Sequence, residues 1–187
     1  MMTTSEQDTF LCEKYPKMMV NRNKSPMESC LSFGIAVGPG WFNILNQLMG
    51  NIQHHIDWRE KQHNWAIDNN IMIAQCKAGN FDLFEQSMSS VIKPEYKEKR
   101  LAEILAGDFL SEVPELIPQV TLDQVKEKFG TLRFYYTGGD DIIDGMVRMA
   151  ESMSGVTCEE CGAPGEQTSG GWIKTACEAH TGNNENV

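Results

Sequence analysis

The C-terminal stretch TCEECGAPGEQTSGGWIKTACEAH, residues 157–180, decides the predicted architecture of this chain. It contains Cys158 and Cys161 and, after fifteen intervening residues, Cys177 and His180. Zn²⁺ prefers thiolate and imidazole ligands in a closed tetrahedron, and two short-spaced pairs joined by a loop can wrap one ion. The pattern therefore predicts a structural zinc site with three cysteine ligands and one histidine ligand.

The residues between the two pairs are also typical of a small zinc module. Gly162 follows the second cysteine, where a metal knuckle needs a residue that can adopt a positive φ angle. Residues 172–175, WIKT, alternate like a short strand that leads into the second pair. We expect a zinc-ribbon-like or treble-clef-like module over residues 155–182, and the sequence leaves the choice between the two geometries open.

Other interpretations of the cysteines explain less of the pattern. A redox pair belongs at a helix start in a βαβ unit, which this stretch does not resemble, and it would leave Cys177 and His180 without a role. A disulfide framework needs an oxidising compartment, for which the sequence carries no signal. A catalytic zinc ion keeps one coordination position open, whereas four protein ligands close the shell, so the expected zinc is structural.

Length and composition are those of a globular protein with a core of ordinary size. The chain has 187 residues, of which 41% are hydrophobic, and no apolar run approaches the 18 residues of a membrane helix. Acidic residues stand near the N-terminus, where a signal peptide needs a basic and then an apolar region, so we expect a cytoplasmic protein. There Cys12, Cys30 and Cys76 are expected to be reduced and to serve as small core residues.

The net charge of −10 is concentrated in the second half of the chain. Residues 94–187 contain 8 Lys and Arg against 17 Asp and Glu, and four glutamates surround the expected zinc ligands. Phosphate contacts dominate affinity for nucleic acid, and an acidic surface cannot make them. We therefore do not expect nucleic acid as a direct ligand of the zinc module.

We expect an α+β core over residues 10–154 and a zinc module over residues 155–182 that packs on this core. The two ends of the chain, residues 1–9 and 183–187, are expected to be disordered tails. Apolar residues from Trp41 to 56 recur at helical spacing, which predicts a helix that continues towards Trp65. The other elements expected in the first part of the chain are a helix over 10–20, a strand over 31–37, and helices over 67–77, 81–92 and 94–106.

A β-hairpin is predicted after a connection over residues 108–118. Hydrophobic and polar residues alternate over residues 120–125, and residues 131–136 are rich in β-forming residues. Phe129-Gly130 lies between the two segments, as expected for a hairpin loop. Asp140 or Asp141 is expected to cap a helix that leads into the zinc site. The predicted fold class is α+β, with a helical N-terminal and middle region, a small antiparallel β-sheet and a C-terminal zinc module.

Four segments of the chain carry a resemblance. Gly38-x-Gly40-Trp41-Phe42 precedes a helix, residues 125–135 read VKEKFGTLRFY, residues 149–154 read MAESMS, and the cysteine pairs flank GWIKT. In this order the segments resemble an uncharacterised family of small bacteriophage and prophage proteins with a C-terminal Cys3His zinc-binding segment. The resemblance is most specific over residues 120–180. It implies a phage origin and an intracellular location, and it brings no known reaction.

Two sets of polar residues and one turn are candidates for ligand binding. Lys126, Lys128 and Arg133 can bind an anion such as phosphate, although a solvated strand face accounts for them equally well. The turn over residues 38–40 can seat an anion at a helix N-terminus, or it can be a tight link between two elements. The histidines and carboxylates of residues 54–63 can bind a metal or transfer protons, but the polar side of a helix has the same pattern.

These observations favour an interaction protein over an enzyme. No phosphate-binding loop, nucleophile elbow or dinucleotide fingerprint occurs, and no catalytic residue is assigned. We expect a phage-encoded accessory factor that binds and modulates a host protein, with a structural zinc ion as its cofactor. The alternative is an enzyme that acts on a nucleotide or nucleic acid through Lys126, Lys128 and Arg133. The partner's identity and the oligomeric state are left open.

Overall fold

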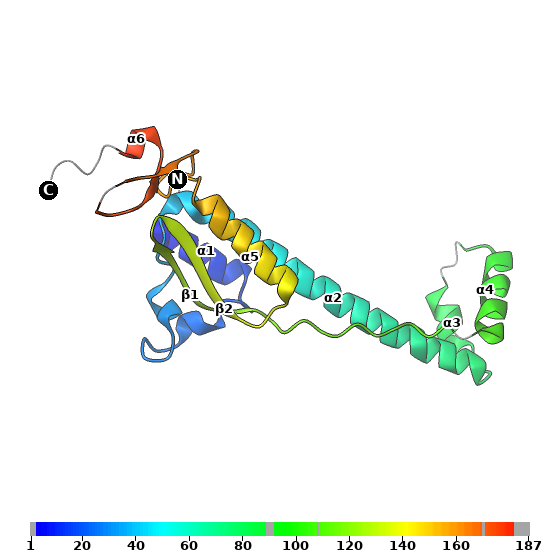
Figure 1. The fold of residues 1–187 in the computed structure, drawn as a ribbon. Coiled ribbons are helices and arrows are strands. Elements are labelled where there is room, and N and C mark those ends of the chain that lie inside the picture. The colour runs from blue at the N-terminus through cyan, green and yellow to red at the C-terminus, as the bar shows by residue number, and fades with distance from the viewer. Residues whose placement is uncertain (1–2, 89–91, 108, 170, 182–187) are drawn as a thin grey trace. The chain divides into compact units, whose positions relative to one another are not determined.

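The computed structural model describes residues 3–88, 92–107, 109–169 and 171–181 (Figure 1). The chain forms two compact units: unit 1 comprises Met1–Ile56 and Ile117–Val187, and unit 2 comprises Asp57–Leu116. The sequence predicted one core over residues 10–154, and this division separates residues 57–116 from it. In the described part of the chain, no helix is long and apolar enough to cross a membrane.

Unit 1 begins with a helix where a disordered tail was expected. Helix α1 spans Thr4–Lys14 and starts at a capping box, in which Thr3 accepts a hydrogen bond from the N–H of Glu6 and the Glu6 carboxylate accepts one from the N–H of Thr3. This reciprocal capping satisfies two backbone donors that would otherwise be unpaired. Leu11 then fixes the helix in the core of unit 1. Residues 183–187, the other expected tail, lie outside the described residues.

The strand expected over residues 31–37 does not form. The side chain of Ser29 accepts a hydrogen bond from the N–H of Leu31 and starts a 3-10 turn, η2 (Cys30–Phe33), which ends at Gly34 with φ 89°. Of residues 31–37, Ala36 alone pairs with a strand, in a single parallel bridge to Lys126. The N–H of Ala36 donates to the carbonyl of Val125, and its carbonyl accepts from the N–H of Glu127. Two further 3-10 helices flank this region, η1 (Val20–Asn23) and η3 (Pro39–Trp41).

One continuous helix, α2 (Phe42–Lys77), replaces the two helices predicted over residues 41–65 and 67–77. The segment contains no proline, and Gly50 is its only glycine, so nothing in its backbone chemistry ends the helix between the two predicted parts. Its apolar face belongs to the core of unit 1 as predicted. The buried residues on this face are Leu45, Leu48, Met49, Ile52 and Ile56.

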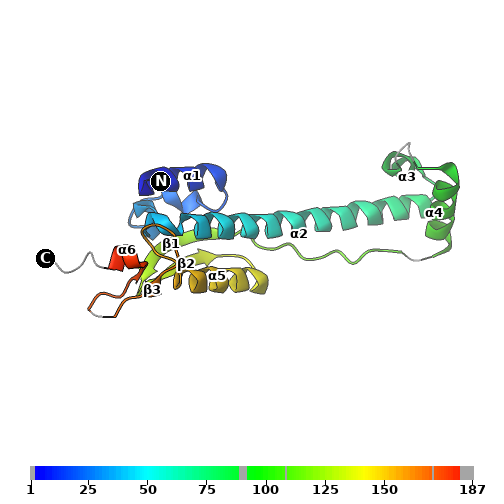
Figure 2. The same cartoon turned by 90° about the horizontal axis from the view of Figure 1, so that it is seen from above.

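The predicted hairpin is confirmed. Strands β1 (Thr121–Lys128) and β2 (Thr131–Thr137) pair antiparallel, with Val125 opposite Phe134. Helix α5 (Asp141–Ser154) lies beside the hairpin in both Figure 1 and Figure 2. Asp140 caps α5 by accepting a hydrogen bond from the N–H of Ile143, as one of the two expected caps.

Side chains of α5 cover the outer edge of β2. The N–H of Leu132 donates to the hydroxyl of Ser154 at 2.8 Å, and the N–H of Phe134 donates to the carboxylate of Glu151 at 3.0 Å. Both backbone donors would otherwise lack a partner within the sheet, because β2 is an edge strand. The edge is therefore closed by polar side chains rather than by another strand.

Unit 2 consists of the second part of α2, helix α3 (Asp82–Ser87) and helix α4 (Pro94–Ala106) (Figure 2). Helix α4 has the predicted bounds, with Pro94 in the first turn, where its missing N–H costs no hydrogen bond. The described part of α3 is shorter than the helix predicted over residues 81–92, of which 89–91 lie outside the described residues. The core of unit 2 is small: Met72, Ile73, Cys76, Phe84 and Ile104.

Phe129 and Gly130 form the two-residue loop of the hairpin with φ angles of 54° and 74°. Two positive φ angles define a type I′ turn, whose first position favours asparagine. We predict that Phe129→Asn raises the free energy of unfolding by about 1 kcal/mol, because a phenylalanine is strained at positive φ. Chemical denaturation measures this change. Phe129→Ala is the control, since alanine removes the ring but retains the strain, and an equal gain with alanine would contradict the explanation.

Candidate metal centre

The first two candidate ligands lie in a tight knuckle. The N–H of Gly162 donates to the carbonyl of Cys158 at 2.8 Å, and the N–H of Cys158 donates to the carbonyl of Ala163 at 2.7 Å. Gly162 has φ 77°, which confirms the predicted need for a positive angle after Cys161. The chain therefore reverses at the second cysteine and turns both thiols towards the same point.

The second pair follows a short hairpin. Strand β3 (Glu166–Gln167) pairs antiparallel with β4 (Thr175–Ala176), so the strand predicted over residues 172–175 begins only at its last residue. Cys177 stands directly after β4, and helix α6 (Glu178–Thr181) begins at the next residue. One helical turn brings His180 back beside Cys177, whose carbonyl accepts the N–H of His180 at 2.9 Å.

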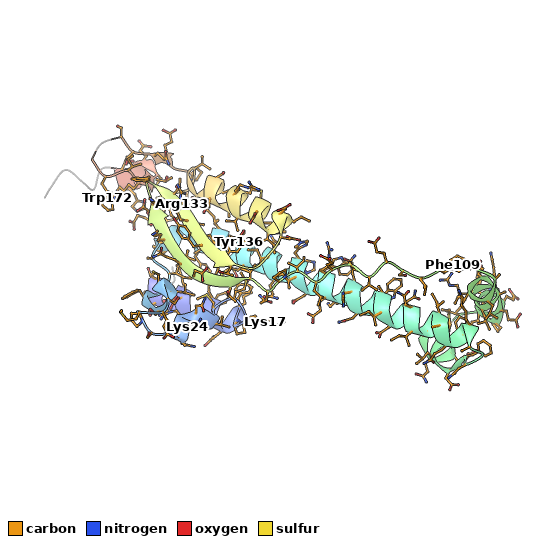
Figure 3. All side chains as sticks on the ribbon, turned by 60° about the horizontal axis from the view of Figure 1, so that its bottom comes forward. Lys17, Lys24, Phe109, Arg133, Tyr136 and Trp172 are labelled. Atoms are coloured by element: carbon orange, nitrogen blue, oxygen red, sulfur yellow. The ribbon has the colours of Figure 1, made fainter. Side chains whose placement is uncertain are left out.

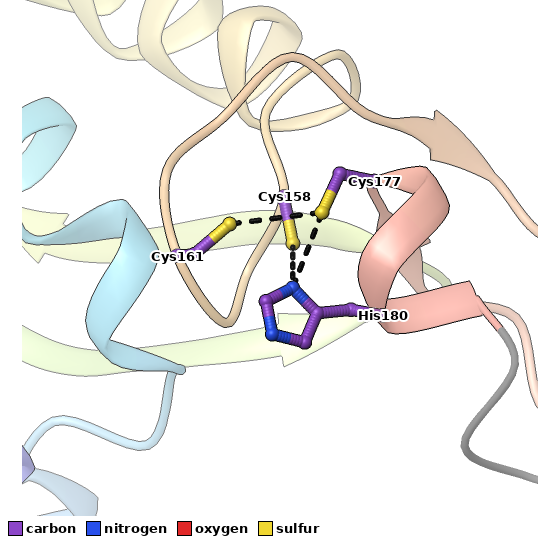
Figure 4. Close-up of side chains that lie close together, drawn as sticks. All are labelled: Cys158, Cys161, Cys177 and His180. Atoms are coloured by element: carbon purple, nitrogen blue, oxygen red, sulfur yellow. Dashed lines mark hydrogen bonds between the residues drawn. The ribbon is translucent and has the colours of Figure 1, made fainter.

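The four predicted ligands converge (Figure 4). Their ligand atoms all lie within 4.8 Å of one another. Nδ1 of His180 is 3.5 Å from the sulfur of Cys158 and 3.2 Å from that of Cys177, and the sulfurs of Cys161 and Cys177 are 3.7 Å apart. A tetrahedral ion with bonds of about 2.3 Å to sulfur and 2.0 Å to nitrogen separates two sulfurs by about 3.8 Å and a sulfur from a nitrogen by about 3.5 Å. The residues present thus fit a single metal ion.

The electrostatics of the cluster favour a cation. Burial raises the pKa of the Cys158 thiol, but backbone N–H groups of Cys177, Cys161 and Glu160 donate to its sulfur and lower the pKa to about 6. At Cys161 the N–H of Ala163 lowers the pKa, yet desolvation and the neighbouring sulfurs outweigh it, so the pKa is raised. The Cys158 and Cys177 sulfurs therefore oppose the ionisation of Cys161, and a divalent cation between the sulfurs would stabilise the thiolates.

Backbone contacts hold the knuckle against the turn that starts η3. The N–H of Gly40 donates to the carbonyl of Glu159 at 2.7 Å, and the N–H of Gly38 donates to the carboxylate of Glu159 at 2.8 Å. The fully buried Trp41 donates its indole N–H to the carbonyl of Thr157 at 2.7 Å. We call these contacts the clasp.

The clasp decides between the two interpretations of residues 38–40. The anion that meets this turn is the chain's own Glu159 carboxylate, whose pKa is raised because it is buried, although the N–H of Gly38 lowers it. The clasp is a contact that was not predicted from the sequence. Its sequence signal is the pair of glycines before Trp41, because a β-carbon at Gly40 would lie 2.3 Å from the carbonyl oxygen of Cys158.

The other candidate residues do not gather around the metal centre. Lys126, Lys128 and Arg133 belong to the β1–β2 hairpin, where Lys126 and Arg133 stand opposite each other. The histidines of residues 54–63 do not converge: His55 contacts Asp140 at 3.0 Å, and His63 contacts the carbonyl of Pro114 at 2.8 Å. The rings of His55 and His63 thus contact different segments of the chain, and these contacts do not bring the two histidines together.

The remaining cysteines differ in environment, and the expectation that all three are core residues is wrong for one of them. Cys76 is buried in unit 2 and Cys12 is half-buried, but Cys30 is exposed. Cys30 begins η2, where the 3-10 turn directs successive side chains to different sides of a short helix. It is therefore a suitable control position for substitutions in the metal centre.

We predict that Gly40→Ala opens the clasp and weakens metal retention. The new β-carbon would meet backbone atoms of Cys158 and Gly162 at 2.3 and 2.4 Å, and backbone cannot move aside as a flexible side chain can. We expect a loss of about 1–3 kcal/mol in the free energy of unfolding and faster transfer of Zn²⁺ to a chromogenic chelator. Gly145→Ala is the control, since its β-carbon meets nothing within 4 Å. Equal behaviour of the two variants would refute the role of the clasp.

Comparisons with protein-family models, curated proteins and solved structures found no match to this chain. Among the described residues, Cys158, Cys161, Cys177 and His180 converge into a cluster that fits a metal ion.

Proposed function

We propose that this chain is a phage-encoded accessory protein that binds and modulates a host protein, and that a structural zinc ion supports its fold. The observation that carries the proposal is the closed cluster of three sulfurs and one imidazole nitrogen. Four protein ligands leave a tetrahedral ion no open position for a substrate. A metal bound there supports structure and leaves binding to other surfaces.

Zinc is the metal that best suits the cluster. Three thiolates and one imidazole are soft and borderline ligands, and zinc accepts them in a tetrahedron without a redox change. The arrangement favours a treble-clef-like module over a zinc ribbon. One ligand pair comes from the knuckle, and the other, Cys177 and His180, comes from the start of a helix rather than from a second knuckle.

Exposed aromatic side chains support the binding of a protein. Trp58 and Trp65 on α2 are 54% and 64% exposed, and tryptophan is the residue type most enriched among energetically dominant interface residues. The two tryptophans are seven positions apart, close to two helical turns, so both lie on one side of α2. Exposed tryptophans contribute little to a monomer's core, so contact with a partner gives them a function.

We predict that Cys158→Ser abolishes stoichiometric zinc binding. Serine is a poor zinc ligand, and the remaining three groups cannot close the tetrahedron. We expect the wild type to bind one equivalent of zinc and the variant to lose it, with faster amide exchange over residues 155–181. Elemental analysis and hydrogen exchange measure both effects. Cys30→Ser is the control, and the assignment is wrong if Cys158→Ser retains a full equivalent of zinc and the wild-type exchange rates.

The proposed function is tested by affinity capture from a bacterial host lysate. The baits are the wild type, Cys158→Ser and Cys30→Ser, all at equal concentration. We expect one host protein to be retained by the wild type and by Cys30→Ser, and to be retained less by Cys158→Ser, because the zinc-supported unit 1 provides part of the binding surface in addition to the tryptophans of unit 2. Retention of no specific protein by the wild type would count against an interaction factor.

A further inference from the structure

One side of the hairpin carries a group of cations that the metal centre does not use. Side chains alternate along β2, so Leu132 and Phe134 are buried while Arg133 lies between them on the opposite side (Figure 3). On β1, Val125 is buried, and Lys126 and Lys128 share the side of Arg133. We call the surface formed by Lys126, Lys128 and Arg133 the basic face.

The three cations of the basic face are close together. Lys126 stands opposite Arg133 in the pairing register, and directly opposite residues have Cβ atoms about 5 Å apart. Lys128 is two residues further along the same strand, a distance of about 7 Å. Among the described residues, no carboxylate forms an ion pair with any of these side chains. The adjacent Glu127 points elsewhere and accepts the N–H of Gly130 at 2.6 Å.

Aromatic rings accompany the cations. Nζ of Lys126 lies 5.3 Å from the ring centre of Tyr135, and Nζ of Lys128 lies 5.5 Å from that of Phe129. Such contacts position an ammonium group without neutralising its charge. Phe129 is 65% exposed and has a positive φ angle, so neither core packing nor turn chemistry accounts for it. An exposed ring beside a cation suits a surface that a partner covers.

The edges of the hairpin exclude one mode of binding. The β2 edge is occupied by Glu151 and Ser154, and the β1 edge is paired at Ala36. A partner therefore cannot add a strand to this sheet without displacing these contacts. It can reach the basic face through side chains.

We propose that the basic face binds an acidic, extended segment of the partner protein, with carboxylates at alternating positions. This inference rests on the proposed function, since it names the surface that meets the partner. Alternate side chains of an extended peptide are about 7 Å apart, the same as Lys126 and Lys128. A short segment with two or three carboxylates matches the three cations. A nucleic acid is longer, and its phosphates would extend onto the surface of a chain with net charge −10.

The test measures binding of a fluorescein-labelled peptide with glutamate at three alternating positions to the zinc-loaded full-length chain. Fluorescence anisotropy in 50 mM salt is expected to show saturable binding, and the same peptide with glutamine in place of glutamate is expected not to bind. The double variant Lys126→Gln, Arg133→Gln should weaken binding roughly tenfold, because charge complementarity provides the recognition. The control Lys61→Gln, Lys99→Gln removes two exposed lysines of unit 2 and should bind as the wild type does.

A variant with reversed charges on the basic face distinguishes a loss of peptide recognition from a loss of folding. The variant Lys126→Glu, Arg133→Glu should lose the glutamate peptide and gain a peptide with lysine at the same positions. The proposal would be overturned if the wild-type protein did not bind the glutamate peptide. It would also be overturned if the protein variant Lys126→Gln, Arg133→Gln bound this peptide as tightly as the wild type does. Equal or tighter binding of single-stranded DNA with the same number of charges would also overturn it, in favour of nucleic acid.

The proposed function and this inference fail separately. The wild type and the variant Lys126→Gln, Arg133→Gln can both serve as baits in the affinity capture. If they capture the same host protein equally well, the interaction function holds and the basic face is not the surface that binds this protein. If the wild type captures no host protein, the proposed function fails, and the peptide titrations still decide whether the basic face recognises acidic segments.

Discussion

Three hydrogen bonds join the turn before α2 to the metal-binding knuckle, and the rest of unit 1 depends on them. Gly38 and Gly40 donate their backbone N–H groups to Glu159, and Trp41 donates its indole N–H to Thr157. The backbones approach so closely that only glycine fits at position 40. Because Trp41 is also part of the hydrophobic core, the clasp connects the ligands of the metal centre to the buried face of α2.

The metal centre is therefore integral to unit 1. The knuckle meets the start of α2, and the β3–β4 hairpin meets the loop of the β1–β2 hairpin. There Thr175 donates its hydroxyl to the carbonyl of Gly130, and Gln167 donates its side-chain amide to the carbonyl of Phe129. In isolated zinc peptides, binding of the ion supplies about 10–16 kcal/mol of apparent folding energy. The proposed zinc ion would stabilise contacts well beyond its four ligands.

In the proposed function, structural support and partner binding belong to different parts of unit 1. The β3–β4 hairpin beside the Cys3His cluster contacts the β1–β2 loop, and the basic face is formed by side chains on one side of the β1–β2 hairpin. Ring faces rather than carboxylates lie beside Lys126 and Lys128. Arg133 donates hydrogen bonds to the hydroxyl of Thr131 and the carbonyl of Leu132, so none of these contacts neutralises the charge of the basic face. A metal ion bound in this cluster would therefore link the occupancy of the candidate metal centre to the shape of the proposed basic face.

The sequence by itself determined the features that depend on residues close together in the chain. Local geometry governs knuckles, turns and helix starts, so these features could be predicted. They are the two ligand pairs Cys158–Cys161 and Cys177–His180, the hairpin around Gly130 and the start of α4 at Pro94. The capping box of α1 is equally local. Its sequence signal is a threonine, Thr3, followed three residues later by Glu6.

Only the tertiary structure decided the rest. Residues 31–37 have the composition of a strand, yet only Ala36 pairs with a strand. Helix α2 continues past Trp65, where the sequence predicted the boundary between two helices. The clasp joins Gly40 to Glu159. The pairing register of the β1–β2 hairpin likewise places Lys126, Lys128 and Arg133 on one side of the sheet. These features result from contacts between segments that are distant in the sequence, and such contacts leave no periodic pattern within either segment.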